Sequence, residues 1–204
     1  MKGLVAPSRP CRITHQSTHA THPRLTAALV LVFGVVATRA LAMELHSPAF
    51  PPNGRLPQIY ACAAEGGKSV PPPLRWSDVP PETKSLALTL QDLTSPHKVI
   101  HWIVYNIPPA RDGDFRVSRR IGEPGRNQLG HLKYDGPCPR HPGQTNRYDF
   151  TLYALDRNIA VKNADFSQLQ SAMKGHILER AQLVGMLAPP PTGTSPSAKR
   201  ESAP

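Results

Sequence analysis

Residues 99–107 read VIHWIVYNI, and this stretch decides the fold class. Apolar side chains occupy both of its alternating faces, which is typical of a central strand covered on both sides. Residues 84–92 read KSLALTLQD, with leucine at every second position and small residues on the other face. Residues 147–155 read RYDFTLYAL and again place apolar side chains on both faces. The three segments predict the strands of a buried sheet.

A helix is predicted after the last of these strands. Asp165 suits the N-cap position, and Gln168 follows three residues later in a variant of the capping box. Apolar residues recur at helical spacing from Phe166 to Val184, and Gly185 is a stop signal. Residues 55–61 are a weaker strand candidate, nearer an edge. Strands followed by a helix predict a mainly β protein, a sandwich of antiparallel sheets with a C-terminal helix.

Length and composition bound the organisation of the chain. Its 204 residues suit one domain with a leader and a tail. Its 24 prolines are far above the usual share of about 5% and argue against a mostly helical protein. We expect a folded domain over residues 43–188 and a disordered tail over residues 189–204, which are rich in Pro, Ser and Thr. A polytopic membrane protein, a coiled coil and a disulfide-dense miniprotein are excluded.

The first 42 residues have the pattern of a secretory signal. Residues 25–37 read LTAALVLVFGVVA, basic residues precede them, and Ala40-Leu41-Ala42 follows them. A basic region, a short apolar core and an A-x-A site predict cleavage after Ala42 and a periplasmic or secreted domain. The apolar run is shorter than the ~20 residues of a bilayer span, so we expect no stable membrane span after cleavage. An uncleaved anchor is the alternative.

The positive charge is concentrated ahead of the domain. Residues 1–42 contain five basic residues and no acidic one, whereas the rest contains 19 basic and 14 acidic residues. Half of the net charge of +10 therefore belongs to the predicted leader. No basic stripe with interleaved aromatic residues follows, so the charge pattern argues against nucleic-acid binding.

Export determines how the cysteines are interpreted. Cys62 and Cys138 remain after cleavage as an even pair in an oxidising compartment, which predicts a disulfide. Such a bridge closes a long loop and is worth roughly 4 kcal/mol in the chain-entropy model. Two buried free thiols are the alternative. Cys138 and His141 are half of a zinc-type pattern without a second half, so neither a metal nor another cofactor is expected.

Three side chains that can donate or accept hydrogen bonds lie on or next to the predicted strands. Asp92 closes one strand at a turn, His101 lies inside the next, and Tyr148 begins a third, while Pro137 belongs to a rigid Gly-Pro-Cys-Pro loop. An imidazole and a phenol donate hydrogen bonds to an anion, and a carboxylate orients the imidazole through its other nitrogen. These residues predict one small anion pocket. In the simpler interpretation, Asp92 only caps a turn and a carbonyl satisfies a buried His101.

Several ordered motifs resemble the phosphatidylethanolamine-binding protein family, in particular its bacterial Raf-kinase-inhibitor-like branch. The resemblance covers residues 47–186. Its motifs are SPAF at 47–50, PPPLRW at 71–76, SLALTLQD at 85–92, HWIVYNIP at 101–108, NQLG at 127–130, YDGPCP at 134–139, RYDFTLYALD at 147–156 and SAMKGHILERAQLVG at 171–185. It implies two antiparallel sheets and a pocket at one end for phosphate or phospholipid head groups.

The resemblance implies site residues one position at a time. Asp92 matches the first acid of the family's D-P-D-A-P turn, His101 its pocket histidine, and Tyr148 the tyrosine of its H-R-Y segment. Two positions depart from the family pattern. Thr94 replaces the second acid, and Asn146 replaces the histidine of H-R-Y. Losing a carboxylate makes the pocket less repulsive to an anion, whereas Asn keeps a neutral donor and removes a positive charge.

A second set of departures lies in the family's G-x-N-x-S-P segment. Ser69 and Pro71 stand there in place of Asn and Ser.

The expected function is that of an exported, non-enzymatic binding protein. Asp92 would orient His101, while His101, Asn146 and Tyr148 would donate to a small anionic ligand such as phosphate or phosphoethanolamine. The outcome would be capture of the ligand or modulation of an unidentified partner protein. A hydrolase of small esters or phosphoesters with His101 as general base and Asp92 as its orienter is the first alternative. An interaction domain with a degenerate pocket, as Thr94 and Asn146 suggest, is the second.

Overall fold

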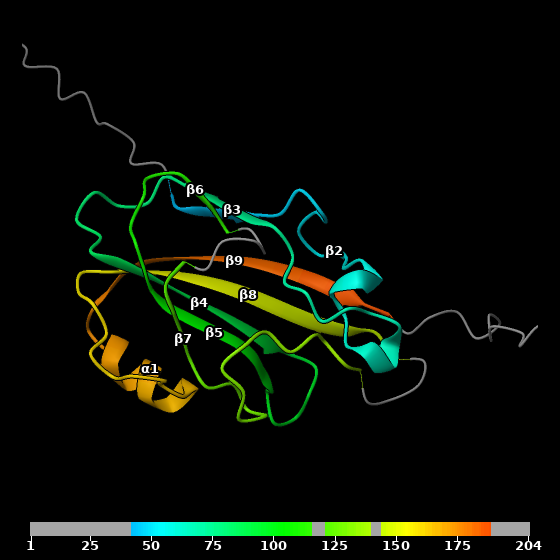
Figure 1. Cartoon of the computed structure of the whole chain (residues 1–204). Helices are drawn as coiled ribbons and strands as arrows, with labels where there is room; N and C mark the ends of the chain where they lie inside the picture. The colour runs from blue at the N-terminus through cyan, green and yellow to red at the C-terminus, as the bar shows by residue number, and fades with distance from the viewer. Residues whose placement is uncertain (1–41, 116–120, 140–143, 189–204) are drawn as a thin grey trace, which may run out of the picture. The chain divides into compact units, whose positions relative to one another are not determined.

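The computed structural model describes residues 42–115, 121–139 and 144–188 (Figure 1). The predicted signal segment up to residue 41, the predicted tail at 189–204 and His141 lie outside these residues. In the described part of the chain, no helix is long and apolar enough to cross a bilayer.

In the residues that the structure describes, two sheets make up the β structure. The larger has six strands in the order β2-β9-β8-β4-β5-β7, and the smaller has the order β1-β3-β6. Neighbouring strands are antiparallel except for the parallel pair β2 and β9. In chain order the strands are β1 (Glu44–His46), β2 (Gly54–Arg55), β3 (Leu74–Ser77), β4 (Ser85–Asp92), β5 (Ile100–Ile107), β6 (Gly113–Phe115), β7 (Glu123–Pro124), β8 (Asn146–Leu155) and β9 (Ile177–Leu187).

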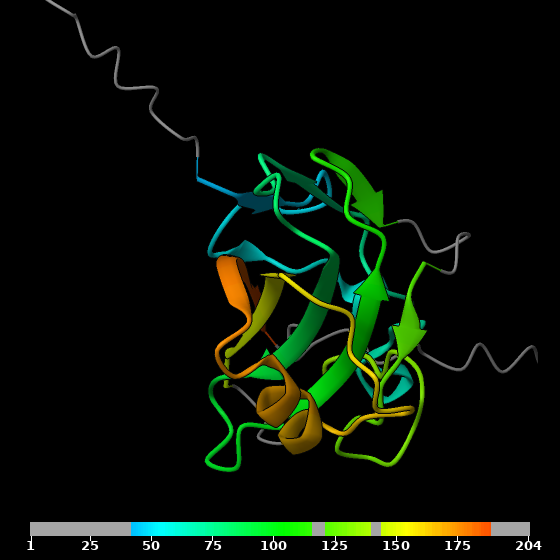
Figure 2. The same cartoon turned by 90° about the vertical axis from the view of Figure 1, so that its left-hand side faces the viewer.

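Apolar side chains cover both faces of the larger sheet, as the central segments predicted. The main cluster lies between the sheets and includes the alternate leucines of β4 with Trp76, Trp102 and Phe150. On the opposite face, helix α1 (Phe166–Met173) buries Leu169 and Met173 against Ile103 and Tyr105 of β5. Figures 1 and 2 show α1 and the smaller sheet on opposite sides of the larger sheet. The predicted mainly β sandwich with one α-helix is confirmed.

The predicted C-terminal helix is shorter than expected. The capping box of Asp165 and Gln168 begins α1 as predicted, but the helix ends at Met173. Gly175 then adopts a left-handed φ of 77°, which turns the chain into β9. Extending the helix to Val184 was wrong because β9 pairs with β8 along almost its whole length. The alternate residues Ala181, Leu183 and Leu187 of β9 point into the main cluster.

The weak strand prediction at 55–61 was also largely wrong. Only Arg55 belongs to a strand, the short β2. Pro57 precedes the 3-10 helix η1 (Gln58–Tyr60), and η2 (Ala63–Glu65) follows. Proline lacks the backbone N–H that a strand ladder requires, so the chain turns here instead of pairing. Cys62, which lies between η1 and η2, belongs to the lining of the candidate site.

Candidate functional site

His101 is the extra residue of a β-bulge. Ile100 and Trp102 of β5 pair with the adjacent residues Gln91 and Leu90 of β4, so His101 has no opposite residue in that ladder. A bulge lets two consecutive side chains face the same side of a sheet. Trp102 belongs to the cluster between the sheets, and the imidazole of His101 packs edge-on against Tyr148 of that same cluster. The bulge therefore turns His101 toward the end of the sandwich core.

The imidazole of His101 is held in a defined orientation. Its Nδ1 lies 3.2 Å from the backbone carbonyl oxygen of Asp135. Because a carbonyl only accepts, Nδ1 carries the proton and donates it. The backbone N–H of Asp135 donates in return to the carbonyl of His101, at 3.1 Å. The sequence predicted Asp92 as the acceptor that orients His101, but the Asp135 carbonyl holds that position at Nδ1.

Asp92 is buried and has hydrogen bonds on both carboxylate oxygens. Oδ1 accepts from the backbone N–H groups of Thr94 at 2.8 Å and Ser95 at 3.1 Å, which closes the turn between β4 and β5. Oδ2 accepts from Nδ2 of Asn146 at 3.0 Å. Asp92 therefore caps the turn, and the cavity lining includes it as well. Asp92 also fixes the Asn146 amide at the start of β8.

The two departures from the family pattern both form local hydrogen bonds. The hydroxyl oxygen of Thr94 accepts from the backbone N–H of Arg147 at 2.8 Å, tying the β4–β5 turn to β8. Asn146 donates to Asp92, and its own Oδ1 is buried without a hydrogen-bond partner in the described structure. These residues therefore organise the turn, the strand end and the wall between them.

Tyr148 lies beneath His101 and does not line the cavity. The two ring centroids are 5.6 Å apart with the planes at 79°. The side chain is fully buried, and its hydroxyl has no hydrogen-bond partner among the described residues. Burial raises the pKa of the phenol well above its ordinary value, and the nearby Asp92 carboxylate raises it further. The two rings are in contact, but the predicted ligand donor Tyr148 packs under the imidazole and is not among the residues that line the cavity.

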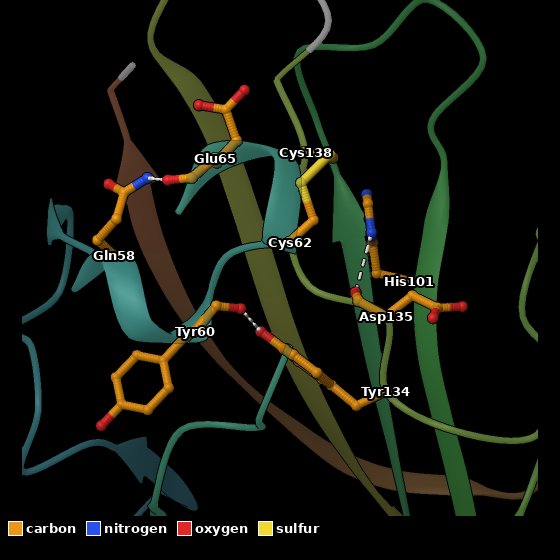
Figure 3. The surroundings of a disulfide bond; sticks show 8 residues. All are labelled: Gln58, Tyr60, Cys62, Glu65, His101, Tyr134, Asp135 and Cys138. Carbon is orange, nitrogen blue, oxygen red and sulfur yellow. Dashed lines mark hydrogen bonds between the residues drawn. A yellow bond between two sulfur atoms is a disulfide. The ribbon is translucent and has the colours of Figure 1, made fainter. Parts of the chain in front are cut away.

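A disulfide between Cys62 and Cys138 belongs to the cavity lining, so the predicted bridge is present (Figure 3). The Cα atoms of the two cysteines are 5.4 Å apart. The backbone N–H of Cys62 also donates to the carbonyl of Pro137 at 2.9 Å. Pro137 is buried, and its contribution to the site is this backbone bond. In the described residues, no group of three or more His, Cys, Asp or Glu side chains is placed to hold a metal ion.

These elements enclose a cavity of about 600 Å³ at one end of the sandwich. Asp92, His101 and Asn146 line it together with both cysteines and Gly136. Pro96 and His97 of the β4–β5 turn are exposed at its rim. A space of this size accommodates a small organic molecule or a phospholipid head group.

The sequence interpretation missed the network behind the Asp135 carbonyl. Nδ2 of the buried Asn127 lies 3.1 Å from the carbonyl of His101 and 2.6 Å from Oδ2 of Asp135. Nδ1 of His131 lies 2.7 Å from that same Asp135 oxygen. Asn127 is the first residue of the NQLG motif, so the motif marked the segment but no local pattern indicated its contact with His101.

Comparison with known proteins agrees with this architecture. The family model described as phosphatidylethanolamine-binding protein matches residues 46–188. A UPF0098 protein of Methanothermobacter thermautotrophicus is 39% identical over 155 residues, which are 71% of this chain and 97% of that protein. A UPF0098 protein of Chlamydia pneumoniae is 38% identical over 150 residues, with 70% and 97% covered.

Solved structures extend the similarity to three dimensions. The crystal structure of a phosphatidylethanolamine-binding protein homologue from Chlamydia trachomatis matches this chain with a TM-score of 0.65 and 38% identity. The match covers 71% of this chain and 96% of that chain. Escherichia coli YbcL has the same TM-score at 24% identity, with 72% and 99% covered, and shares the fold. From the matched family model, the identities and the sandwich itself, we conclude that this chain belongs to the phosphatidylethanolamine-binding protein family.

Proposed function

We propose that this chain is an exported, non-enzymatic binding protein whose cavity holds a small anion such as phosphate or a phospholipid head group. The observation that carries the proposal is the orientation of His101 on the cavity wall. Because Nδ1 donates its proton to the Asp135 carbonyl, Nε2 would need a proton of its own to donate to the ligand. Protonation makes Nε2 a charged donor, and hydrogen bonds from charged donors to phosphate are among the strong ones.

Asn146 supplies a second donor in this proposal. One amide hydrogen goes to Asp92, and a carboxamide has two hydrogens to offer. The Asp92 carboxylate holds the amide in place, so little side-chain freedom is lost when a ligand binds. Tyr148 supports the imidazole from below instead of donating to the ligand.

The carboxylate of Asp92 favours a ligand that also carries a positive group. Asp92 lines the cavity with His101 and His97. Carboxylates repel a bare anion at short range and attract an ammonium group. A zwitterion such as phosphoethanolamine therefore fits this lining better than inorganic phosphate does.

The disulfide supports the proposed periplasmic or secreted location, since such bonds persist in oxidising compartments. Modulation of a partner protein is the second part of the proposal. The exposed rim at Pro96 and His97 supports it, because a partner that contacts this turn would sense an occupied cavity.

Ligand titration followed by NMR of the histidine rings tests the proposal. Phosphate and phosphoethanolamine should shift the His101 ring signals in a saturable way, with tighter binding of phosphoethanolamine and stronger binding at acidic pH. His101→Gln should weaken binding about tenfold or more, because one charged hydrogen bond is lost. His176→Gln is the matched control, since His176 pairs with Asp156 away from the cavity.

Thermal unfolding of both variants checks that they are folded. Binding that is equal in His101→Gln and wild type would contradict the anion site. Turnover of a phosphoester that is lost only in His101→Gln would replace the binding function with the hydrolase alternative.

A further inference from the structure

The disulfide and the orienting carbonyl of His101 belong to one continuous wall of the cavity. Figure 3 shows the Cys62–Cys138 bond and the His101–Asp135 hydrogen bond in the same view. Cys62, Cys138, Gly136 and His101 all line the cavity. The two cysteines are 76 residues apart in sequence, so the bond joins two parts of the wall that come from distant segments of the chain.

Gly136 connects the segment of Cys62 to the Asp135 carbonyl that accepts from His101. A Cβ on Gly136 would lie 2.5 Å from the carbonyl carbon of Ala61 and 2.6 Å from the nitrogen of Cys62, so only glycine allows this approach. The Asp135 carbonyl and the nitrogen of Gly136 lie in one planar peptide unit. A displacement of Gly136 from the Ala61–Cys62 backbone would therefore also move the carbonyl that accepts from Nδ1 of His101.

Among the described residues, two hydrogen bonds accompany the disulfide between these segments. The backbone bond from Cys62 to Pro137 lies beside the disulfide. The hydroxyl of Tyr134 donates to the carbonyl of Tyr60 at 2.9 Å, deeper in the core. Both cysteines are only partly buried, so their sulfur atoms are at a wall that small molecules reach.

We propose that the Cys62–Cys138 disulfide is a positioning element of the ligand site, so that reduction of the disulfide weakens anion binding. This inference rests on the proposed anion site and adds its dependence on thiol chemistry. Reduction by a dithiol consumes two electrons and two protons. One reductant sulfur attacks a cysteine Sγ, the S–S bond breaks, and the second reductant thiol resolves the mixed disulfide. The products are two protein thiols and the oxidised reductant.

The proposal gives the disulfide a role beyond stability. A chain whose cysteines are still reduced would hold the anion poorly, and the site would mature when the bond forms in an oxidising compartment. Preorganised sites lose affinity when the supporting groups become mobile.

The experiment compares the full chain before and after treatment with dithiothreitol, together with the double variant Cys62→Ser, Cys138→Ser. Phosphate and phosphoethanolamine are titrated, and the ¹⁵N shifts of His101 report which ring nitrogen carries the proton. We expect about tenfold weaker binding without the disulfide and a loss of the Nδ1–H signature. Reoxidation of the dithiothreitol-treated protein should restore both.

Met173→Ala is the matched control for stability. It removes a buried side chain of the α1 cluster on the opposite face of the sheet and leaves the cavity intact. Near-ultraviolet circular dichroism confirms that each protein is folded, and the reversible reduction of wild type replaces the double variant if the latter does not fold. Unchanged affinity and unchanged ring shifts in the reduced, folded protein would overturn the positioning role. A similar loss of affinity in Met173→Ala would overturn it too.

Failure of the underlying anion site gives a different result. In that case the oxidised wild-type protein binds neither phosphate nor phosphoethanolamine, while the ring shifts still report whether the disulfide positions His101.

Discussion

Asp92 and Asp149 are two equally buried carboxyl groups with opposite surroundings. Their exposed fractions are 4% and 5%, and they lie one step apart on the β4–β8 ladder. Asp92 has hydrogen bonds on both oxygens at the pocket end. Asp149 lies in the middle of β8, where Oδ2 accepts from Thr151 at 3.1 Å and Gln182 at 2.8 Å. Its Oδ1 is buried without a partner in the described residues.

Strand position explains the difference. At the end of β4 the chain turns, and the freed backbone N–H groups of Thr94 and Ser95 point at the carboxylate. In the middle of a strand the ladder consumes the backbone groups, so only side chains are left to solvate a charge. Burial raises the pKa of Asp149, and the bonds from Thr151 and Gln182 oppose that rise only in part. A buried carboxylate is thus better solvated at a strand end than within the strand.

Replacing each of the two aspartates by alanine should give the largest difference in stability between the two sites. Asp92→Ala takes the acceptor from two backbone donors and from Asn146, and should lower the free energy of unfolding by about 3 kcal/mol. Asp149→Ala should cost much less, because Gln182 already lies 3.5 Å from the Thr151 hydroxyl and can bond to it. Urea unfolding measures both values.

Asp92→Asn gives the finer test of the strand-end site. It keeps an acceptor for the turn but sets its amide against Nδ2 of Asn146, so its cost should lie between those of Asp92→Ala and wild type. Equal losses for Asp92→Ala and Asp149→Ala would show that strand position does not control the solvation of these carboxyls.

Asp149→Asn should stabilise the protein at neutral pH, by less than about 1 kcal/mol because water screens part of the effect. A carboxyl with a raised folded-state pKa holds its proton more tightly when folded. Its favourable contribution is present below the unfolded-state pKa of about 3.9 and is lost as pH rises through the folded-state pKa. The neutral Asn avoids this loss.

Urea unfolding at several pH values checks the Asp149→Asn effect. The gain over wild type should be present at neutral pH and should disappear under acid conditions. A gain that does not depend on pH would mean that ionisation of Asp149 is not its source.

Tyr148→Phe should have the smallest effect. The hydroxyl has no partner among the described residues, so its removal forfeits no hydrogen bond, and the ring still packs against His101. We expect stability within about 0.5 kcal/mol of wild type, as for a substitution that breaks no contact, and an unchanged affinity for phosphate. Calorimetric titration with phosphate measures the affinity. A large loss of binding would return the phenol to the role of a ligand donor.

Short sequence patterns were sufficient to predict the elements that one pattern alone specifies, such as hydrophobic alternation or a helix cap. Two-sided apolar strands identified β5 and β8, alternating leucines identified β4, and the capping pair identified the start of α1. The even cysteine pair predicted the disulfide. The family motifs that contain Asp92 and His101 indicated where the cavity lies, and both residues line it. Helical spacing failed beyond Met173, where pairing with β8 outweighed the apparent helical period.

The orientation and hydrogen-bond partners of the site residues depend on pairing between segments that are distant in the sequence. The register of β4 against β5 makes His101 the bulged residue, and this turns its ring toward the cavity. The Asp135 carbonyl reaches His101 from 34 residues away, and Asn146 reaches Asp92 from 54 residues away. Sequence patterns describe which face a side chain prefers, whereas a hydrogen bond depends on atomic positions that distant segments set together. The partners and orientation of each pocket group therefore came from the folded chain, and its chemical type came from the sequence.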